Sequence, residues 1–401
     1  MIVKNEELAL PKCLGSVKGV VDEMVVLDTG SCDRTPEIAR EFGARVYHFE
    51  WCNDFSAARN ESLKYVQGDW VLVLDADEVL VPEIVPTLKQ AIKRDSRSGD
   101  SFSRYLAINL VRQEVGAAQS PYSLVSRLFR NHPDICFSRP YHALIDDSVC
   151  RILSQEPQWQ VGYLPKVAIL HEGYQKSAIA QGDKFAKAQA AMEGFLASHP
   201  NDPYVCSKLG SLYVQTGWFA RGIELLELGL ASYPVNAQIL YEIHYHLGIA
   251  YTRLQHPEQA IAHYQVATQV AIYPMLKLGA YNNLGNLRRA DGDLTGAKTA
   301  YEMALQIDPN FVAAHYNLGM TLKAMGCLKD AIASYQQAIQ LNPTYAEAYQ
   351  NLGVVLLKLG LVPDSLAAFQ RATALHEQQQ NPAEAKRLRQ GLKEMGLGSL
   401  S

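Results

Sequence analysis

The sequence predicts an α/β domain followed by an all-α repeat array. Three observations support this fold class. Short apolar runs alternate with helix-like stretches in the first quarter of the chain, the last three of five landmark glycines are spaced by 34 residues in the second half, and 401 residues exceed one ordinary core. We therefore expect at least two domains of different architecture.

The first part of the chain supplies the elements of a largely parallel sheet. Four apolar runs are typical of strands, namely MIVK at the start, EMVVLD (23–28), ARVYHF (44–49) and WVLVLD (70–75). Helix-like stretches separate them, from Glu6 to Val20, Thr35 to Phe42 and Ser56 to Val66. This alternation predicts a sheet covered by helices. A second block contains FSRYLAINLV, SLVSRLF and KVAILH, and we expect it to extend the sheet.

Acidic residues stand where two predicted strands end. Asp28 closes the second strand, and Asp75, Asp77 and Glu78 follow the fourth in WVLVLDADEVL. Sheets of this kind bind ligands beyond the carboxyl ends of their strands. One interpretation is a bound divalent cation, which prefers oxygen ligands. The other is a polar strand end before a helix that begins near Pro82.

Two further segments place polar groups at the same edge. VVLDTGSCDRT (25–35) follows Asp28 with a Gly-Ser turn and a helix, where a backbone can approach a ligand closely. NDFSAARNESL (53–63) offers Arg59 and Asn60 near the start of another helix. An arginine fork could pair with phosphate oxygens. The edge thus presents an acid for a base or ribose, a cation for phosphate and acids for a metal.

The second half of the chain is a repeat. Its landmark glycines each follow a helical stretch, and small residues recur twelve and nineteen positions later. The glycines are Gly210, Gly248, Gly285, Gly319 and Gly353. Small residues let two antiparallel helices pack closely, and Pro234, Pro309 and Pro343 end three of the units. This is the tetratricopeptide (TPR) pattern, with about five units.

The sheet half resembles the family 2 glycosyltransferases, which have the GT-A fold. The matching stretches are MIVKNEE, VVLDTGSCDRTPEIA, DFSAARNESL and WVLVLDADEVL, in the order of that family. The nearest pattern is a bacterial subgroup whose transferase domain is often followed by TPR repeats. The resemblance implies a GT-A-type nucleotide-sugar-binding domain followed by an all-α TPR superhelix. Family members usually have apolar residues before MIVKNEE, whereas about three residues of strand remain here. Either the start lies upstream or the first strand is short.

We divide the chain accordingly into four parts. A family 2 glycosyltransferase-like domain covers 1–175, a connecting helix 176–202, about five TPR repeats 203–378, and a C-terminal capping helix or tail 379–401. The connecting stretch is amphipathic, since Phe185, Ala188, Met192 and Phe195 share one face.

The resemblance implies inverting transfer of a sugar from a nucleotide-diphosphate donor, commonly a UDP-sugar. Asp28 matches the position that contacts the base, and Arg59 and Asn60 lie in the segment near the uracil and diphosphate. Asp75 and Asp77 match the D-x-D pair that holds Mn²⁺ or Mg²⁺, Asp75 also lying near the nucleotide. Such a cation offsets charge on the departing diphosphate.

The general base is less determined. The subgroup implies a histidine-glutamate pair after a RLFRN-like stretch, but His142 is followed here by Ala143. The candidates are His142, Asp146 and Asp147, and the two aspartates are alternatively a surface turn. Transfer needs such a base to take the proton of the acceptor.

Three more residues have two interpretations each. His171 in AILHEGY matches a histidine that can complete the metal shell, or it bonds backbone at a strand end. HEGYQ lacks the second histidine of a zinc-protease helix. Arg127 and Arg130 could contact phosphate or acceptor, but solvated strand-end charges are the favoured interpretation.

Composition excludes several classes. The formal net charge of −4 argues against a nucleic-acid surface, and no apolar stretch is long enough for a membrane span. The acids in MIVKNEE come too early for a signal peptide. Seven cysteines without a C-x-x-C pair favour reduced thiols and a cytoplasmic location.

The leading hypothesis is a metal-dependent hexosyltransferase whose repeats bind a protein, peptide or glycan acceptor, or a partner, in a concave groove. Tyr301, Tyr335 and Phe369 are expected in the repeat core rather than at a ligand. An alternative is a non-catalytic TPR scaffold with a degenerate transferase domain. A nucleotidyltransferase is disfavoured, because KNEELALPK is not a Gly-rich, basic phosphate loop.

Overall fold

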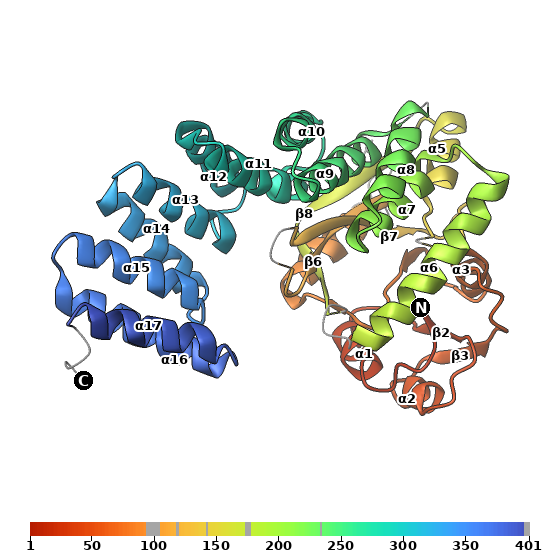
Figure 1. Cartoon of the computed structure of the whole chain (residues 1–401). Coiled ribbons are helices and arrows are strands. Elements are labelled where there is room, and N and C mark those ends of the chain that lie inside the picture. Colours follow the sequence, from red (N-terminus) through yellow and green to blue (C-terminus); the bar gives the residue numbers. More distant parts are fainter. Residues whose placement is uncertain (94–104, 118–119, 142, 173–177, 233–234, 397–401) are drawn as a thin grey trace. The chain divides into compact units, whose positions relative to one another are not determined.

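The computed structural model describes residues 1–93, 105–117, 120–141, 143–172, 178–232 and 235–396, with only the backbone of 178–184. The chain forms two compact units, Met1–Val235 and Asn236–Ser401 (Figure 1). The two units differ in architecture. Unit 1 contains both sheets, and unit 2 is entirely helical.

Unit 1 contains a parallel and a mixed sheet. Their strands are β1 (Ile2–Val3), β2 (Val25–Asp28), β3 (Arg45–His48), β4 (Trp70–Leu72), β5 (Glu78–Leu80), β6 (Tyr105–Glu114), β7 (Tyr122–Arg130) and β8 (Gln160–His171). The first sheet has the order β1-β2-β3 with parallel pairing. The second has the order β4-β7-β6-β8-β5, in which only β6 and β8 pair in parallel.

The predicted apolar runs all contain strands, but β5 (Glu78–Leu80) was not predicted and the pairing was wrong. WVLVLD was expected in the same parallel sheet as the first three strands, whereas β4 pairs antiparallel with β7. The strand-like runs of the second block form β6, β7 and β8, which are the three inner strands of a second sheet with β4 and β5 at its edges. Strand pairing depends on contacts between distant segments, which local apolar runs do not encode.

Helices cover both faces of the mixed sheet. The helices of unit 1 are α1 (Leu10–Val17), α2 (Thr35–Glu41), α3 (Phe55–Leu63), η1 (Pro82–Ile84), α4 (Val85–Lys93), α5 (Asp146–Gln155), α6 (Ala178–Ser198), α7 (Pro203–Gln215) and α8 (Phe219–Ala231). On one face, side chains of α1 and α4 pack with Leu110 and Leu128. On the other, Val149 and Ile152 of α5 pack against Val71. Asp75 thus follows a strand of a sheet whose two faces are both covered.

Unit 2 consists of helical hairpins and a final helix. Its helices are α9 (Ala237–Arg253), α10 (Pro257–Gln269), η3 (Pro274–Lys277), α11 (Leu278–Ala290), α12 (Leu294–Ile307), α13 (Val312–Ala324), α14 (Leu328–Leu341), α15 (Ala346–Lys358), α16 (Val362–Gln378) and α17 (Pro382–Glu394). Each hairpin pairs an odd-numbered helix with the next, and α17 packs on α16. The hairpin α7/α8 follows the same pattern within unit 1.

The repeat glycines seat aromatic rings of the partner helix. A Cβ at Gly319 would lie 2.7 Å from the ring of Tyr335, and one at Gly285 would lie 2.6 Å from the ring of Tyr301. Tyr301 and Tyr335 are completely buried, and Phe369 is nearly so. The expectation that these aromatic residues belong to the core is confirmed.

The length and apolar character of the helices decide whether one of them could span a membrane. Within the ranges described above, no helix combines the length and the apolar character that spanning a bilayer requires.

Candidate functional site

The acidic segment after β4 is a tight turn. The amide of Glu78 donates to the carbonyl of Asp75 at 3.0 Å, which joins β4 to β5. Leu74 and Ala76 are buried, at 4% and 6% exposure. The apolar residues of the turn thus fill the core, and the alternate positions 75 and 77 carry their carboxylates away from it.

Asp75 is held between two arginines. Its Oδ1 accepts a hydrogen bond from Nη2 of Arg59 at 2.7 Å, and its Oδ2 accepts one from Nη2 of Arg127 at 2.6 Å. Burial alone would raise the pKa of Asp75, but the charges of Arg127 and Arg59 outweigh it and hold this pKa well below its usual range. Both carboxylate oxygens are engaged, so this geometry does not present Asp75 as a metal ligand.

Arg127 is buried and paired, unlike the solvated strand-end charge that the sequence favoured. Only 13% of its side chain is exposed, and Nη2 also approaches Oε1 of Glu78 at 3.4 Å. Burial acts to lower the pKa of Arg127, yet the negative charges of Asp75 and Glu78 raise it. Arg127 therefore stays charged in the site.

Arg59 carries hydrogen-bond donors that no described group satisfies. Its guanidinium lies over the ring of Phe137 at 5.4 Å and bonds Asp75 through Nη2 alone. Nε and Nη1 are buried without a partner among the described residues. Burial lowers the pKa of Arg59 while Asp75 opposes that shift. Unsatisfied buried donors are rare in proteins and indicate a missing partner.

Glu78 connects the two halves of a longer ion network. It is fully buried, its Oε2 accepts from the amide of Asp75 at 2.9 Å, and its Oε1 accepts from Nη1 of Arg112 at 2.8 Å. Arg112 in turn donates through Nε to Oε1 of Glu114 at 2.9 Å. Glu78 therefore orients charged neighbours rather than facing a ligand itself.

The network ends in a carboxylate–histidine–carboxylate arrangement. His171 lies with Nδ1 2.5 Å from Oε2 of Glu114 and with Nε2 3.5 Å from Oδ2 of Asp77. Burial would lower the pKa of His171, but Asp77 and Glu114 together raise it to about 9. The alternative in which His171 bonds only backbone does not describe this side chain.

The pair Asp77 and His171 fits a divalent cation as two of its ligands. Ligand bonds of about 2.1 Å place neighbouring ligand atoms roughly 3 Å apart, close to the 3.5 Å found here. A histidine that ligates a metal commonly has its second nitrogen on a carboxylate, as Glu114 provides. Across the described residues, no three His, Cys, Asp or Glu side chains converge in metal-holding geometry. The protein would thus supply two ligands and leave the remaining positions to substrate and water.

Asp28 lies at the end of β2, apart from this network. Its carboxylate accepts from the amides of Gly30 at 3.3 Å and Ser31 at 3.2 Å, and approaches Nδ1 of His48 at 3.3 Å. Gly30 has φ +99°, a conformation that favours glycine. Asp28 is 3% exposed. It therefore shapes the turn after β2.

Asn60 has a structural role in this geometry, and its assignment to the nucleotide stays a prediction. Its Nδ2 donates to the carbonyl of Phe137 at 2.9 Å, and its Oδ1 accepts from the amide of Phe137 at 2.7 Å. Both ends of the amide are used on one backbone. Asn60 thereby fixes α3 to the segment that supports Arg59.

The three base candidates fall into different environments. His142 lies outside the described residues. Asp147 is 58% exposed, and its Oδ2 accepts from Nη1 of Arg139 at 2.5 Å and from Ser138 Oγ at 2.7 Å. That pairing removes Asp147 as a free base.

Asp146 is the candidate with an available oxygen. It begins α5, and its Oδ1 accepts from Oγ of Ser126 at 3.4 Å. Its Oδ2 is buried, and no described group bonds it. Burial raises the pKa of Asp146, and the charge of Asp147 adds to the rise. A raised pKa suits a group that must accept a proton near neutral pH.

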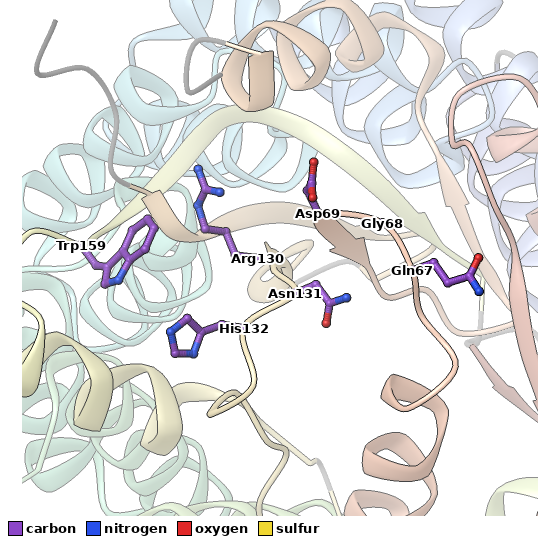
Figure 2. A pocket seen from close by; sticks show the side chains of 7 residues that line it. All are labelled: Gln67, Gly68, Asp69, Arg130, Asn131, His132 and Trp159. Atoms are coloured by element: carbon purple, nitrogen blue, oxygen red, sulfur yellow. The ribbon is translucent and has the colours of Figure 1, made fainter. Parts of the chain in front are cut away.

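A hollow of about 270 Å³ lies at the opposite end of β4 (Figure 2). There Arg130 is placed between the rings of Trp70 and Trp159, at 4.9 Å and 5.0 Å, and burial lowers its pKa. Asp69, before β4, lines this hollow, whereas Asp75 follows the strand. Arg130 therefore belongs to neither the acidic turn nor its network.

Sequence reasoning did not find three residues of the network as site residues. Glu78 was grouped with the acids as one more metal candidate, and Arg112 and Glu114 were not singled out in the sequence. Their only sequence mark is alternation along β6, which places 112 and 114 on one face of the strand.

Comparisons with known proteins identify both parts of the chain. The model of the glycosyl transferase family 2 matches residues 1–162, and that of the TPR repeat matches 285–326 and 321–360. A TPR repeat-containing protein of Synechococcus elongatus is 44% identical over 309 residues, which cover 77% of this chain and 75% of that protein. The glycosyltransferase SunS of the Bacillus subtilis SPbeta prophage is 27% identical over 205 residues.

The coverage of these relatives differs. The aligned part takes up 51% of this chain and 46% of SunS, so the chain spans about half of that relative. Among solved structures, MamA aligns with a TM-score of 0.39 at 23% identity, covering 43% of this chain and 96% of MamA. YrrB, described as a TPR protein with an unusual peptide-binding site, aligns with a TM-score of 0.40 at 16% identity over 49% of this chain and 98% of YrrB. The two family models and the 44% identical relative show that this chain is a TPR repeat-containing protein whose residues 1–162 form a family 2 glycosyltransferase domain.

Proposed function

We propose that the protein is a metal-dependent, inverting hexosyltransferase that takes its sugar from a nucleotide-diphosphate donor, a UDP-sugar first of all. The observation that carries this proposal is the network after β4. It combines an arginine pair held by one aspartate with a second aspartate beside a carboxylate-bound histidine. Cations and a metal site are what a diphosphate leaving group requires.

The arginine pair is proposed to hold the diphosphate. Asp75 fixes Arg59 and Arg127 in one place, and Arg59 still has two unsatisfied donors. Phosphate oxygens are strong acceptors for a guanidinium. Asp28 and its Gly30 turn are assigned to the nucleoside side, where the buried carboxylate keeps the loop in shape.

Asp77 and His171 are proposed to hold Mn²⁺ or Mg²⁺. The cation, when bound, supplies positive charge against the diphosphate that departs. Glu114 keeps Nδ1 of His171 engaged, which leaves Nε2 directed toward Asp77. Asp75 contributes to this charge balance indirectly, through the arginines.

Asp146 is proposed as the base for the acceptor. In the transfer, the acceptor oxygen forms a bond to the anomeric carbon, the bond from that carbon to the diphosphate oxygen breaks, and its electron pair leaves with the nucleotide. The acceptor proton goes to the free Oδ2 of Asp146. The repeats are proposed to bind a protein, peptide or glycan acceptor or a partner, and the cytoplasm is the proposed location.

Donor binding tests this function without knowledge of the acceptor. Calorimetric titration of UDP into the full chain, with and without Mn²⁺, is expected to show tighter binding with the metal. Release of UDP from a panel of UDP-sugars would then identify the donor. If the protein binds no UDP at all in the presence of Mn²⁺, the transferase proposal fails.

One observation favours a non-catalytic scaffold as the second candidate. Position 143, where the subgroup implies glutamate, is an alanine packed against the core of the mixed sheet. The methyl side chain of Ala143 can neither accept nor donate a proton. UDP binding without sugar transfer or donor hydrolysis by any UDP-sugar would support the scaffold.

A further inference from the structure

Unit 2 contains a group of three cations on successive repeats. Arg289 lies at the end of α11, Lys323 near the end of α13, and Lys358 ends α15. We call Arg289, Lys323 and Lys358 the cationic face. The three helices are the first helices of their hairpins, so the cations occur once in each of three consecutive repeats.

Side-chain bonds fix these helices beside one another. Nδ2 of Asn317 on α13 donates to Oδ1 of Asn282 on α11 at 2.8 Å. Nδ2 of Asn351 on α15 donates to the hydroxyl of Tyr316 on α13 at 3.1 Å, and Nζ of Lys323 donates to Oδ1 of Asn351 at 2.6 Å. The cationic face therefore rests on a rigid row of three helices.

No carboxylate of the described residues forms an ion pair with any of the three cations. Burial, and then the charges of Lys358 and Arg289, lower the pKa of Lys323, so both neighbours repel Lys323. Glu347 lies eleven positions before Lys358, about 16 Å along α15, and acts on Tyr316 together with Arg289 without pairing with any of the three cations. Positive charge therefore exceeds negative charge here.

Two buried polar atoms beside the cationic face lack partners. Nε of Arg289 and the hydroxyl of the fully buried Tyr335 have no hydrogen bond among the described residues. Burial raises the pKa of Tyr301 and Tyr335. A hydrogen bond with Arg289 and then its charge oppose that rise at Tyr301, and its charge opposes it at Tyr335. Arg387 and Arg389 have carboxylate partners, whereas Lys329 and Lys386 have none among the described residues. What marks the cationic face as a site for an external anion is that its three cations lie on neighbouring helices, beside buried atoms without partners.

The spacing of the helices indicates the size of that anion. Neighbouring helices pack about 8–10 Å apart, so three in a row spread their cations over roughly 20 Å. That is about the length of six extended residues and exceeds the reach of one phosphate. We propose that the cationic face binds an extended acidic segment of a protein partner. The inference rests on the proposed function, since it names the chemistry of the partner or acceptor that the repeats would take.

Fluorescence anisotropy with the full chain tests the proposal. The probe is a labelled peptide of about ten alternating Asp and Gly residues, and its matched control has Asn in place of Asp. We expect the acidic peptide to bind, and the triple variant Arg289→Gln, Lys323→Gln, Lys358→Gln to weaken that binding at least about tenfold, which corresponds to about 1.4 kcal/mol. Lys358→Glu alone is expected to weaken binding in the same direction, and this exposed position avoids the bond of Lys323 to Asn351.

A second triple variant controls for net charge. Lys329→Gln, Lys386→Gln, Lys393→Gln removes the same charge from exposed positions on α14 and α17 and should leave affinity within about twofold. Equal losses in both triple variants, equal binding of the Asn peptide, or tighter binding of a single-stranded oligonucleotide would overturn the proposal. UDP titration of the first triple variant should match the parent protein, so a failed peptide experiment is distinguishable from a failed transferase proposal.

Discussion

The transferase site and the repeat unit treat charge in opposite ways. Around Asp75 and His171, each carboxylate of the network is matched by an arginine or a histidine, and the open positions are donors of Arg59. In unit 2, glycines make room for tyrosine rings where the hairpins pack, and the cationic face has no carboxylate partner among the described residues. Buried charge is tolerated when it is paired and bonded, whereas unpaired charge is kept for a ligand.

The largest effect should separate the two aspartates that begin α5. Asp146→Asn removes the group that takes the acceptor proton while keeping its shape, so UDP release from the donor should fall roughly 10³-fold. UDP affinity should stay unchanged. Asp147→Asn is the matched control, because Asp147 is already paired with Arg139. Equal turnover in the two variants would contradict the assignment of Asp146.

The next largest effect is expected on the free energy of unfolding, when the network that stabilises unit 1 is broken. Asp75→Asn leaves Arg59 and Arg127 without their shared partner, and the free energy of unfolding should fall by about 3 kcal/mol. Urea denaturation followed by circular dichroism measures this change. Glu41→Gln removes an exposed pair with Arg34 and should cost less than about 0.5 kcal/mol. A similar cost for both variants would mean that the network is solvated.

Shape packing in unit 2 can be broken with one methyl group. Gly319→Ala would place a Cβ 2.7 Å from the ring of Tyr335, and this overpacking should cost about 2 kcal/mol. Gly391→Ala in α17 meets nothing within 4 Å and should stabilise its helix by about 0.5–1 kcal/mol. Thermal unfolding of both variants provides the comparison. Destabilisation by Gly391→Ala would show that glycine acts there for another reason.

The smallest expected effect is a pH dependence in unit 2. His244 and His263 approach with their Nδ1 atoms 2.9 Å apart, and burial, then the charge of His263, lowers the pKa of His244 to about 4. Because the unfolded chain binds this proton near pH 6.5, stability should fall as the pH drops from about 6.5 towards 4. His244→Phe should flatten that part of the curve of unfolding temperature against pH. An unchanged slope would assign the pH dependence to other histidines.

The sequence predicted the elements of the site better than their partners. Asp28, Asp75 and Asp77 were placed at strand ends because apolar runs end there, and local pattern is enough for that. Arg127 was misjudged because its burial depends on Asp75, which is 52 residues away, and on β7 pairing with β4. The register of β6 and β7 also shifts between Ile108 and Leu110, which simple alternation does not reveal.

Asn60 illustrates the same limit. Its position in α3 suggested a nucleotide contact, but its amide is used on the backbone of Phe137, 77 residues further along the chain. In unit 2 the glycine positions were predictable, because the repeat spacing alone requires close helix packing. The cationic face was not found, because its members look like ordinary helix ends: Arg289 and Lys323 follow their repeat glycines by four residues and Lys358 by five.

The central claim is that Asp77 with His171 holds the cation, while Asp75 holds the arginines. The direct measurement is the ratio of UDP dissociation constants without and with Mn²⁺, in the parent protein, Asp77→Asn and Asp75→Asn, each first shown to be folded. We expect a ratio of at least about 30 in the parent, a ratio near one in Asp77→Asn, and a preserved ratio with weaker binding throughout in Asp75→Asn. A ratio that survives Asp77→Asn but disappears in Asp75→Asn would contradict this account.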